Sequence, residues 1–247
     1  MSISNSIGKS KPVKRVFLFL LLCVFSSSFL KAQAEIHDTL VKERIEYIQK
    51  SLDEGKPGAK LWWNAWFYGY TAGTLVQGSI FLVSDELKTR QDMSLGAATA
   101  LIGAVGQLVM PMVPASAPGK LVMIPGDTRE ERLSKLKKAE ELFAASAQRE
   151  KDGRSWKMHA ISGAVNLSSG LITWIGFDRS VWAGLGNFAL NTVVTEAQIW
   201  TQPTRAIKEY KKYCELYKNG LPYSSLNPKT HFIVNVYPGG LTLRILF

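Results

Sequence analysis

The sequence has only two cysteines, and its glycines follow no three-residue period. Two cysteines are too few for a disulfide-stapled scaffold, and the missing glycine period excludes a collagen-like chain. Hydrophobic residues make up 46% of the 247 residues and charged residues 20%, which is too apolar a composition for a disordered tail. The sequence therefore predicts one compact domain or two small ones.

Recognisable catalytic and metal-binding motifs are also missing from the sequence. His37, His159 and His231 are far apart, and none has a second ligand one helical turn or one strand step away. The sequence contains no phosphate-binding loop, no Gly-x-Ser-x-Gly motif and no catalytic cysteine pair. We therefore expect a non-enzymatic protein that binds no metal and no cofactor.

The N-terminal segment 1–34 has the pattern of a secretory signal peptide. Basic residues without any acid precede an apolar run from Val16 to Phe25, and Ala32-Gln33-Ala34 fits a signal-peptidase site. The mature chain is predicted to begin at Glu35. An uncleaved anchor helix is the alternative, although the apolar run is short for a span of about 20 residues. Export would place the protein in the bacterial cell envelope, associated with a membrane.

The net charge of +10 does not by itself predict nucleic-acid binding. Residues 1–34 carry five Lys or Arg residues and no acid, so half of this charge belongs to the predicted signal. Basic residues at 129–157 alternate with acids, which is typical of a solvated helix face. A denser group of Lys208, Lys211 and Lys212 is predicted to contact anionic lipid head groups, with a plain solvated face as the alternative.

Residues 35–119 are predicted to form an amphipathic helix followed by an apolar helical hairpin. Apolar residues recur at steps of three and four up to about residue 54, as on one face of a helix. Gly55, Pro57 and Gly58 are expected to end this helix.

Two long apolar arms form the first hairpin. Residues 61–84 carry no formal charge, and they are numerous enough to cross a bilayer. The return arm begins at Met93 and is expected to be helical to about Met110. Three prolines then predict an extended connection up to residue 119.

The same order repeats in residues 120–220. Thr128 and Glu131 have the spacing of a capping box, which predicts the start of a second amphipathic helix ending near Gly153. A second apolar hairpin follows, with arms at 158–177 and 181–200. We interpret the repeated order as an ancient duplication, which predicts a bundle of four apolar helices with two amphipathic helices packed against it.

The chain is predicted to end with a basic helix and a β-hairpin. The helix follows Pro203, and its inward face is expected to carry Ile207, Tyr210, Tyr213 and Leu216. Within 221–247, a loop at 222–229 precedes two segments that alternate apolar and polar residues across Pro238-Gly239-Gly240. The final segment, which ends at Phe247, resembles the C-terminal strand of outer-membrane β-barrel proteins, but two strands are too few for a barrel. We expect a mostly α fold on which this hairpin docks.

Small and polar residues mark the expected contacts inside the bundle. Glycines allow helix backbones to approach closely, and polar side chains on apolar helices must point inward. The glycines at predicted packing positions are Gly69, Gly73, Gly163, Gly170 and Gly184. The polar residues predicted to line the interior are His159, Asn166, Asn187, Asn191, Glu196 and Gln198.

His159 and Glu196 are expected to lie at the same level of the second hairpin. They are nearly equidistant in sequence from the turn at Asp178-Arg179. The pair is predicted to form a structural hydrogen bond, with a proton relay or an acid–base couple as the alternative.

The predicted function is that of a non-enzymatic, membrane-associated structural or assembly component of the cell envelope. The alternative is a small transporter or channel-like bundle that passes a polar solute through an interior lined by Asn, Gln and Glu. Most Lys and Arg of the predicted mature chain lie in 114–157 and 201–247. Two spanning hairpins would return both segments to the exported side, against the usual rule for inner-membrane insertion. The choice of membrane therefore stays open, as does the choice between hairpins that span it and hairpins buried in an oligomer. Expected partners are membrane lipid and a second copy or another envelope protein, but no nucleic acid.

Overall fold

The computed structural model describes residues 12–217, 231–237 and 240–246, and it describes side chains at residue 35 and from 37 to 217. The chain is mostly helical, as predicted. In chain order the elements are α1 (Pro12–Val83), α2 (Leu87–Val109), α3 (Val113–Val122), α4 (Arg129–Gly153), α5 (Trp156–Leu171), the π-helical turn η1 (Ile172–Gly176), α6 (Val181–Thr201), α7 (Arg205–Tyr217), β1 (His231–Tyr237) and β2 (Gly240–Leu246).

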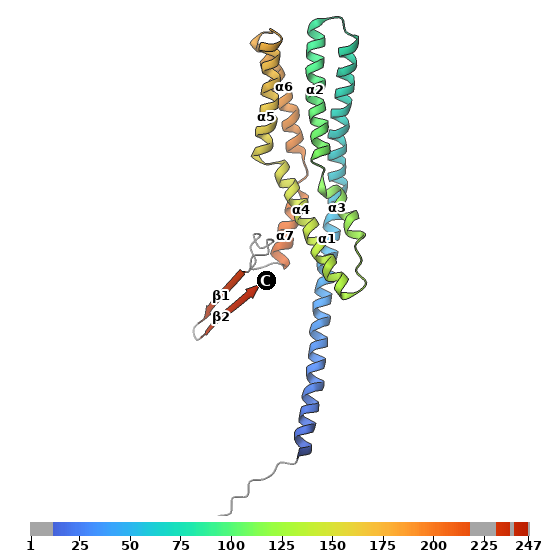
Figure 1. The fold of residues 1–247 in the computed structure, drawn as a ribbon, viewed down its shortest axis with the longest axis vertical. Helices are drawn as coiled ribbons and strands as arrows, with labels where there is room; N and C mark the ends of the chain where they lie inside the picture. Colours follow the sequence, from blue (N-terminus) through green and yellow to red (C-terminus); the bar gives the residue numbers. More distant parts are fainter. Residues whose placement is uncertain (1–11, 218–230, 238–239, 247) are drawn as a thin grey trace, which may run out of the picture.

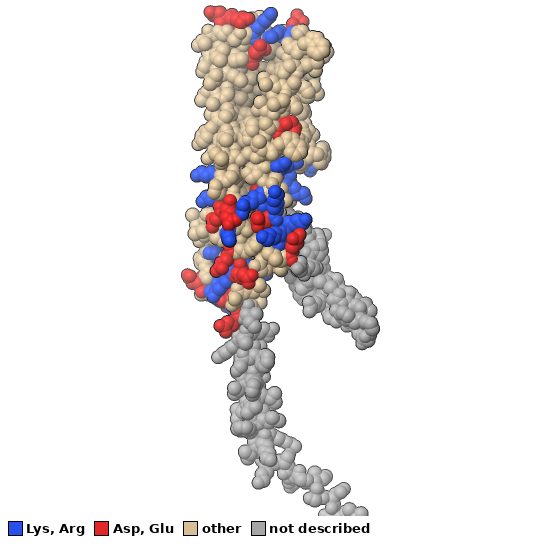
Figure 2. All heavy atoms as spheres, turned by 180° about the vertical axis from the view of Figure 1, so that it is seen from behind, with Lys and Arg blue, Asp and Glu red and all other residues tan. Residues whose placement is uncertain are grey.

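The helices form two regions along the long axis (Figure 1). The region that we call the bundle consists of residues 61–83 of α1 together with α2, α5–η1 and α6. The head consists of residues 35–60 of α1 together with α3, α4 and α7. The bundle ends at a tip, formed by the α1–α2 and η1–α6 turns. Figure 2 shows charged side chains on the head and at the tip, with an almost uncharged surface between them.

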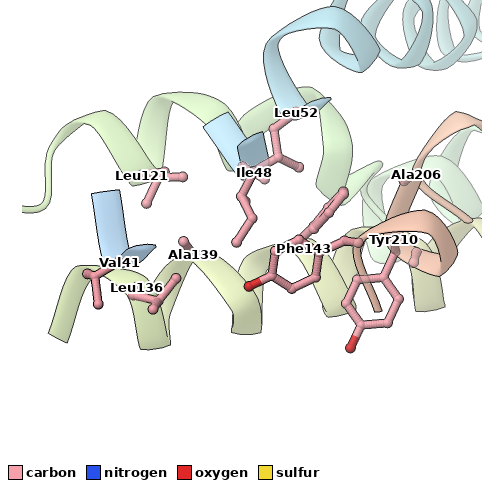
Figure 3. Close-up of a cluster of buried hydrophobic side chains, with 12 residues drawn as sticks. Val41, Ile48, Leu52, Leu121, Leu136, Ala139, Phe143, Ala206 and Tyr210 are labelled. Atoms are coloured by element: carbon pink, nitrogen blue, oxygen red, sulfur yellow. The ribbon is translucent and has the colours of Figure 1, made fainter. Parts of the chain in front are cut away.

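The head has a hydrophobic core made by all four of its helices (Figure 3). Phe143 of α4 lies at its centre, where its ring meets the Tyr210 and Tyr213 rings of α7 edge to face at 5.4 and 5.8 Å. Ile48 of α1 and Leu121 of α3 close the core from the other side. Burial of these large side chains is the main source of the head's stability.

The head core also explains why α1 is continuous, contrary to our expectation that it ends at Gly55, Pro57 and Gly58. Pro57 removes one backbone hydrogen bond from the helix interior. Leu52 and Ala59, on either side of it, are both buried, so tertiary packing holds the helix on each side of the proline. The first amphipathic helix and the first apolar arm are therefore one rod.

The proline-rich connection is helical rather than extended, which is a second correction. Pro114 lies in the first turn of α3, where its missing N–H has no intrahelical partner to lose. Pro118 lies inside the helix, but Pro114, Ala117, Pro118 and Leu121 are all buried. Their burial against α1 and α4 offsets the lost hydrogen bond.

The start and end of the second amphipathic helix are confirmed. Thr128 Oγ1 accepts a hydrogen bond from the Glu131 N–H at 3.2 Å, and Glu131 Oε2 accepts one from the Thr128 N–H at 3.0 Å. The backbone donors around Glu131 hold the pKa of its carboxyl below its usual value. The helix ends at Gly153.

The second hairpin turns after η1, a π-helical segment that the sequence pattern did not predict. Asp178 has a φ of 50°, and Ser180 caps α6 by accepting the Ala183 N–H at 3.2 Å.

In α7, Tyr210 and Tyr213 are buried as expected, but Leu216 is exposed, contrary to its predicted inward position.

Strands β1 and β2 pair antiparallel, with His231 opposite Leu246 and Tyr237 opposite Gly240. The predicted loop at 222–229, the turn residues Pro238-Gly239 and the terminal Phe247 lie outside the described residues, as do residues 1–11 of the predicted signal. Docking of the predicted β-hairpin on the bundle stays a prediction.

Candidate functional site: the bundle, its polar seam and its joint with the head

The bundle buries mostly small and polar side chains, whereas the head buries large apolar ones. The buried residues of its four apolar arms are Trp62, Ala104, Gln107, Asn166, Ser169, Gly170, Thr173, Gly184 and Ile199. These are mostly small or polar. Large apolar side chains such as Leu82, Val109 and Leu190 are instead exposed along the outer faces. An exposed apolar surface of this extent is typical of an interaction with lipid or protein.

One helical segment among the described residues, Leu87–Val122, is long and apolar enough to cross a membrane by length and composition. It contains α2 and α3, and only 17% of its apolar window is buried inside the fold. The core helix of a soluble protein is mostly buried, and this segment is not.

Side chains of α5 and α6 form a ladder of hydrogen bonds that we call the polar seam. Asn166 Nδ2 donates to Thr195 Oγ1 at 2.8 Å. Ser169 Oγ donates to Asn187 Oδ1 at 2.6 Å, and Asn191 Nδ2 donates to the same Asn187 oxygen at 2.9 Å. The structure thus brings together Asn166, Asn187 and Asn191, which the sequence placed in the interior, and adds Ser169 and Thr195.

The closest helix approach in the bundle lies beside the seam. A Cβ atom on Gly170 would lie 2.8 Å from the Gly184 carbonyl oxygen, and one on Gly184 would lie 2.7 Å from the Gly170 carbonyl oxygen. These two predicted packing glycines therefore form the α5–α6 crossing. Gly73 lies opposite Ala100 of α2, where a Cβ would make ordinary contact at 3.6 Å.

The other two predicted packing glycines are corrected by the structure. A Cβ atom on Gly69 or on Gly163 would have no neighbouring atom within 4 Å, so neither glycine allows a close helix approach in this fold. The α1–α2 contact instead uses Gly103, which lies against the Tyr70 ring, and Gly96, which lies against the Gln77 amide. A glycine spacing within one helix could not identify these contacts, because they depend on the aromatic and polar residues of the opposite helix.

His159 and Glu196 meet at the head-side end of the seam. His159 Nδ1 lies 2.9 Å from Glu196 Oε1 and 3.0 Å from Oε2, and Trp200 Nε1 donates to Oε2 at 3.0 Å. Both side chains are about one-third exposed. No group of three or more His, Cys, Asp or Glu residues in the described part of the chain is arranged to hold a metal ion.

Gln198 faces the first hairpin rather than the seam. Its Oε1 accepts a hydrogen bond from the Tyr70 hydroxyl at 2.7 Å. Nearby, the indoles of Trp62 and Trp66 donate to Thr201 Oγ1 at 3.2 and 3.3 Å. These bonds join the two hairpins near the head, and the sequence predicted none of them because the relative placement of the hairpins is a tertiary property.

A single ion pair joins the hairpins at the tip within the described residues. Arg179 Nη1 lies 3.3 Å from Asp92 Oδ1. The two hairpins are therefore tied at both ends of the bundle.

Two arginines at the end of α4 connect the head to the bundle. Arg149 donates to the carbonyl oxygens of Met110 and Pro111 at 2.9 and 3.2 Å, where α2 ends. Arg154 donates to the carbonyl oxygens of Trp200 and Gln202 at 3.3 and 3.1 Å, where α6 ends. Unpaired carbonyls at a helix C-terminus favour cations, so each arginine stabilises the end of one hairpin. Burial lowers the pKa of Arg149.

Glu150 lies between these arginines and is almost completely buried. Its Oε2 accepts the Ile207 N–H at 3.1 Å and so caps the N-terminus of α7. Its main-chain oxygen accepts a bond from Gln202 Nε2 at 2.7 Å. Burial raises the pKa of Glu150 to about 7, although the backbone donors of Ile207 and Ala206 act in the opposite direction. The charged surroundings of Glu150 in the sequence gave no signal of this position.

The predicted lipid patch on α7 lies on the outer face of the head. Lys208, Lys211 and Lys212 are exposed, and Lys211 Nζ lies 4.0 Å from Glu215 Oε1. Tyr210 and Tyr213 are buried in the head core, so they add no exposed aromatic ring to these three lysines.

Comparisons with protein-family models, with curated proteins and with solved structures gave no match. Functional conclusions therefore rest on the residues and their geometry.

Proposed function

We propose that this chain is a non-enzymatic membrane protein of the cell envelope, acting as a structural or assembly component with its bundle in the bilayer and its head beside it. The observation that carries the proposal is that the bundle exposes its large apolar side chains and buries small and polar ones. In water, the exposed leucines, valines and isoleucines of four helices would cost about 25 cal/mol for each Å² of apolar surface. In a bilayer the same surface is favourable, and the buried polar seam satisfies its groups internally.

The exposed tryptophans support a bilayer of ordinary thickness around the bundle. Trp156 and Trp174 are 18 positions apart, as are Trp182 and Trp200, and all four side chains are exposed. At about 1.5 Å per helical residue, each pair is separated by about 27 Å along its helix. The hydrocarbon core of a bilayer is about 30 Å thick, and tryptophans concentrate at its two interfaces.

The order of elements supports an internal duplication. In each half an amphipathic segment leads into two apolar arms and then into a short helix, α3 in the first half and α7 in the second. The α1–α3 contact corresponds to the α4–α7 contact under this relation. Two such units, completed by a C-terminal β-hairpin docked on the helices, form the architecture that we propose.

A structural role is favoured over transport by the state of the seam. Asn166, Ser169 and Thr173 are buried, and their side chains form hydrogen bonds within the α5–α6 pair. A solute path would require such groups to be available to the solute. Glu196 is likewise engaged by His159 and Trp200.

Export is the part of the proposal that rests on the N-terminal sequence. The basic, apolar and small-residue segments of 1–34 support removal of a signal peptide before Glu35. The backbone of α1 is helical through this position. N-terminal sequencing of the protein recovered from cells would show Glu35 as the first residue if cleavage occurs, and an upstream residue if it does not.

Membrane insertion is tested by adding a charge at two positions that are similarly exposed in the fold. Leu190, on α6 in the bundle, is 68% exposed, and Leu216, on α7 in the head, is 56% exposed. In water, aspartate is tolerated at both positions. In a bilayer, a carboxylate at position 190 costs several kcal/mol.

We expect wild-type protein and Leu216→Asp to stay in the membrane pellet after a carbonate wash, and Leu190→Asp to be lost from that pellet. Release of the wild-type protein by carbonate, with equal behaviour of the two variants, contradicts the proposal.

A further inference from the structure

The two ends of the bundle differ in charge. The tip turns carry four acidic and three basic residues. Two of these bases are engaged within the fold, since Arg179 pairs with Asp92 at 3.3 Å and the Arg90 guanidinium lies 5.2 Å from the centre of the Phe81 ring. The tip therefore offers little free positive charge.

Five basic side chains lie near the opposite end of the bundle, and we call them the collar. They are Lys56 and Lys60 of α1, Lys151 of α4, Arg154 between α4 and α5, and Lys157 of α5. Within the described residues none of them has an ion-pair partner. Figure 2 shows Lys and Arg side chains gathered just below the uncharged surface of the bundle.

The acidic residues at the level of the collar do not cancel its charge. Glu54 is paired with Arg205, and Glu150 is buried against the start of α7. Asp53 and Asp152 remain as exposed acids at this level, so the collar keeps a positive excess.

Arg154 is held in a position suited to an anionic group at the edge of the bundle. Its Nη1 donates to the carbonyl oxygens of Trp200 and Gln202, and its guanidinium lies 5.2 Å from the centre of the Trp200 ring. Trp156, two residues further along the chain, is exposed. Exposed tryptophans mark the level of lipid head groups, where a phosphate diester is the anion that lysine and arginine donors meet.

We propose that the collar binds the head groups of anionic phospholipids in the leaflet on the head side. The proposal rests on the proposed function, because the collar lies at the level of the head groups only when the bundle is in a bilayer. Near an anionic surface, each Lys or Arg contributes about a fivefold gain in lipid affinity. Several basic residues at one level therefore select anionic over zwitterionic lipid, and more strongly at low salt.

The test uses the full chain in vesicles that mix phosphatidylglycerol with phosphatidylcholine, with bromine on one lipid at a time. Tryptophan quenching then reports which lipid surrounds the bundle. We expect the wild-type protein to be quenched preferentially by brominated phosphatidylglycerol. The triple variant Lys56→Gln/Lys60→Gln/Lys157→Gln is expected to lower this preference by about tenfold or more at low ionic strength.

Two control variants lose the same charge away from the collar. Lys88→Gln/Lys120→Gln/Lys137→Gln is expected to keep the preference. Lys208→Gln/Lys211→Gln/Lys212→Gln is also expected to keep it, because these lysines lie on α7 in the head, where we now favour the solvated face over the lipid contact that the sequence predicted. Equal quenching of the wild-type protein by both brominated lipids, or an equal loss of preference in a control variant, overturns the collar proposal while still showing insertion. Absence of quenching by either lipid overturns the proposed function instead.

Discussion

At the scale of single residues, the bundle is held together by contacts that leave little room for substitution. The polar seam joins Ser169, Asn187 and Asn191 in one hydrogen-bonded group, and the Gly170–Gly184 crossing lies next to it. Positions on a helical face were enough to predict that the asparagines point inward. Their partners could not be predicted, because the rotation of α5 relative to α6 is set by the whole hairpin.

The α5–α6 crossing predicts that alanine at Gly184 lowers the stability of the fold. A Cβ at this position would lie 2.7 Å from the Gly170 carbonyl oxygen and 2.8 Å from Trp174 Cβ, and neither atom is at the flexible end of a side chain. The helices must therefore separate in Gly184→Ala, and overpacking of this kind costs about 1–3 kcal/mol. The midpoint of thermal unfolding in detergent, followed by circular dichroism, is expected to fall by several degrees.

Gly186 of the same helix provides the matched control. A Cβ atom on Gly186 would have no neighbouring atom within 4 Å. Replacing glycine by alanine inside a helix also stabilises the helix by about 1 kcal/mol. Gly186→Ala is therefore expected to leave the midpoint unchanged or to raise it. Equal midpoints for the two variants would show that α5 and α6 do not cross at Gly184.

Glu150 predicts a specific pH dependence of stability. Its pKa is about 7 in the fold, against an ordinary value of 4.5, so the folded state binds a proton in this range that the unfolded state releases. This group makes folding less favourable as the pH rises from about 4.5 to 7, and the effect is complete above that window. Glu150→Gln removes the contribution of this group to the pH dependence of stability.

The measurement is the midpoint of thermal unfolding between pH 5 and 8 for wild type, Glu150→Gln and the exposed-site control Glu141→Gln. The decline with rising pH is expected to be shallower in Glu150→Gln than in the other two proteins. Parallel curves for all three would mean that Glu150 is not buried as a cap of α7.

At the scale of elements, burial decides where local sequence signals fail. Gly55, Pro57 and Gly58 are strong helix-ending residues, and Pro114 and Pro118 are typical of an extended segment. Both segments are nevertheless helical, because the residues next to these prolines pack into the head core or at the base of the bundle. A single sequence does not show how much packing a segment will gain, so α1 and α3 could not be predicted correctly.

The start and end of helix α4 could be predicted from local sequence alone. The contribution of its N-terminal capping box to stability can be measured. Removing the Thr128 hydroxyl leaves the Glu131 N–H without its side-chain acceptor. Thr128→Ala is expected to lower the free energy of unfolding by about 1 kcal/mol. Urea denaturation followed by circular dichroism measures this difference.

Ser134→Ala is the control, because Ser134 is exposed on the same helix outside its cap. It is expected to change the free energy of unfolding by much less. Alanine has a higher helix propensity than serine or threonine, so a loss of the same size in both variants would show that the capping box is not the cause.

At the scale of the whole molecule, two kinds of helical packing share one chain. The head buries Phe143, Ile48 and Leu121 as a soluble domain does, whereas the bundle buries small and polar residues and exposes large apolar ones. The long uncharged arms predicted this contrast in outline. The ties between the hairpins, such as Tyr70 with Gln198 and Arg179 with Asp92, depend on the tertiary arrangement and emerged only from the structure.

The central claim is that the bundle crosses a bilayer, with its tip on one side and its head on the other. Two single-cysteine proteins test it, each with Cys23 and Cys214 replaced by serine. Asp85→Cys places a thiol at the exposed tip, and Lys212→Cys places one on the exposed face of the head.

The decisive measurement is labelling of these two proteins by a membrane-impermeant maleimide in sealed, uniformly oriented membrane vesicles, before and after detergent is added. The account predicts that one thiol reacts in intact vesicles, that the other reacts only after detergent, and that reversing the vesicle orientation exchanges the two. Reaction of both thiols from the same side would contradict a bundle that spans the membrane.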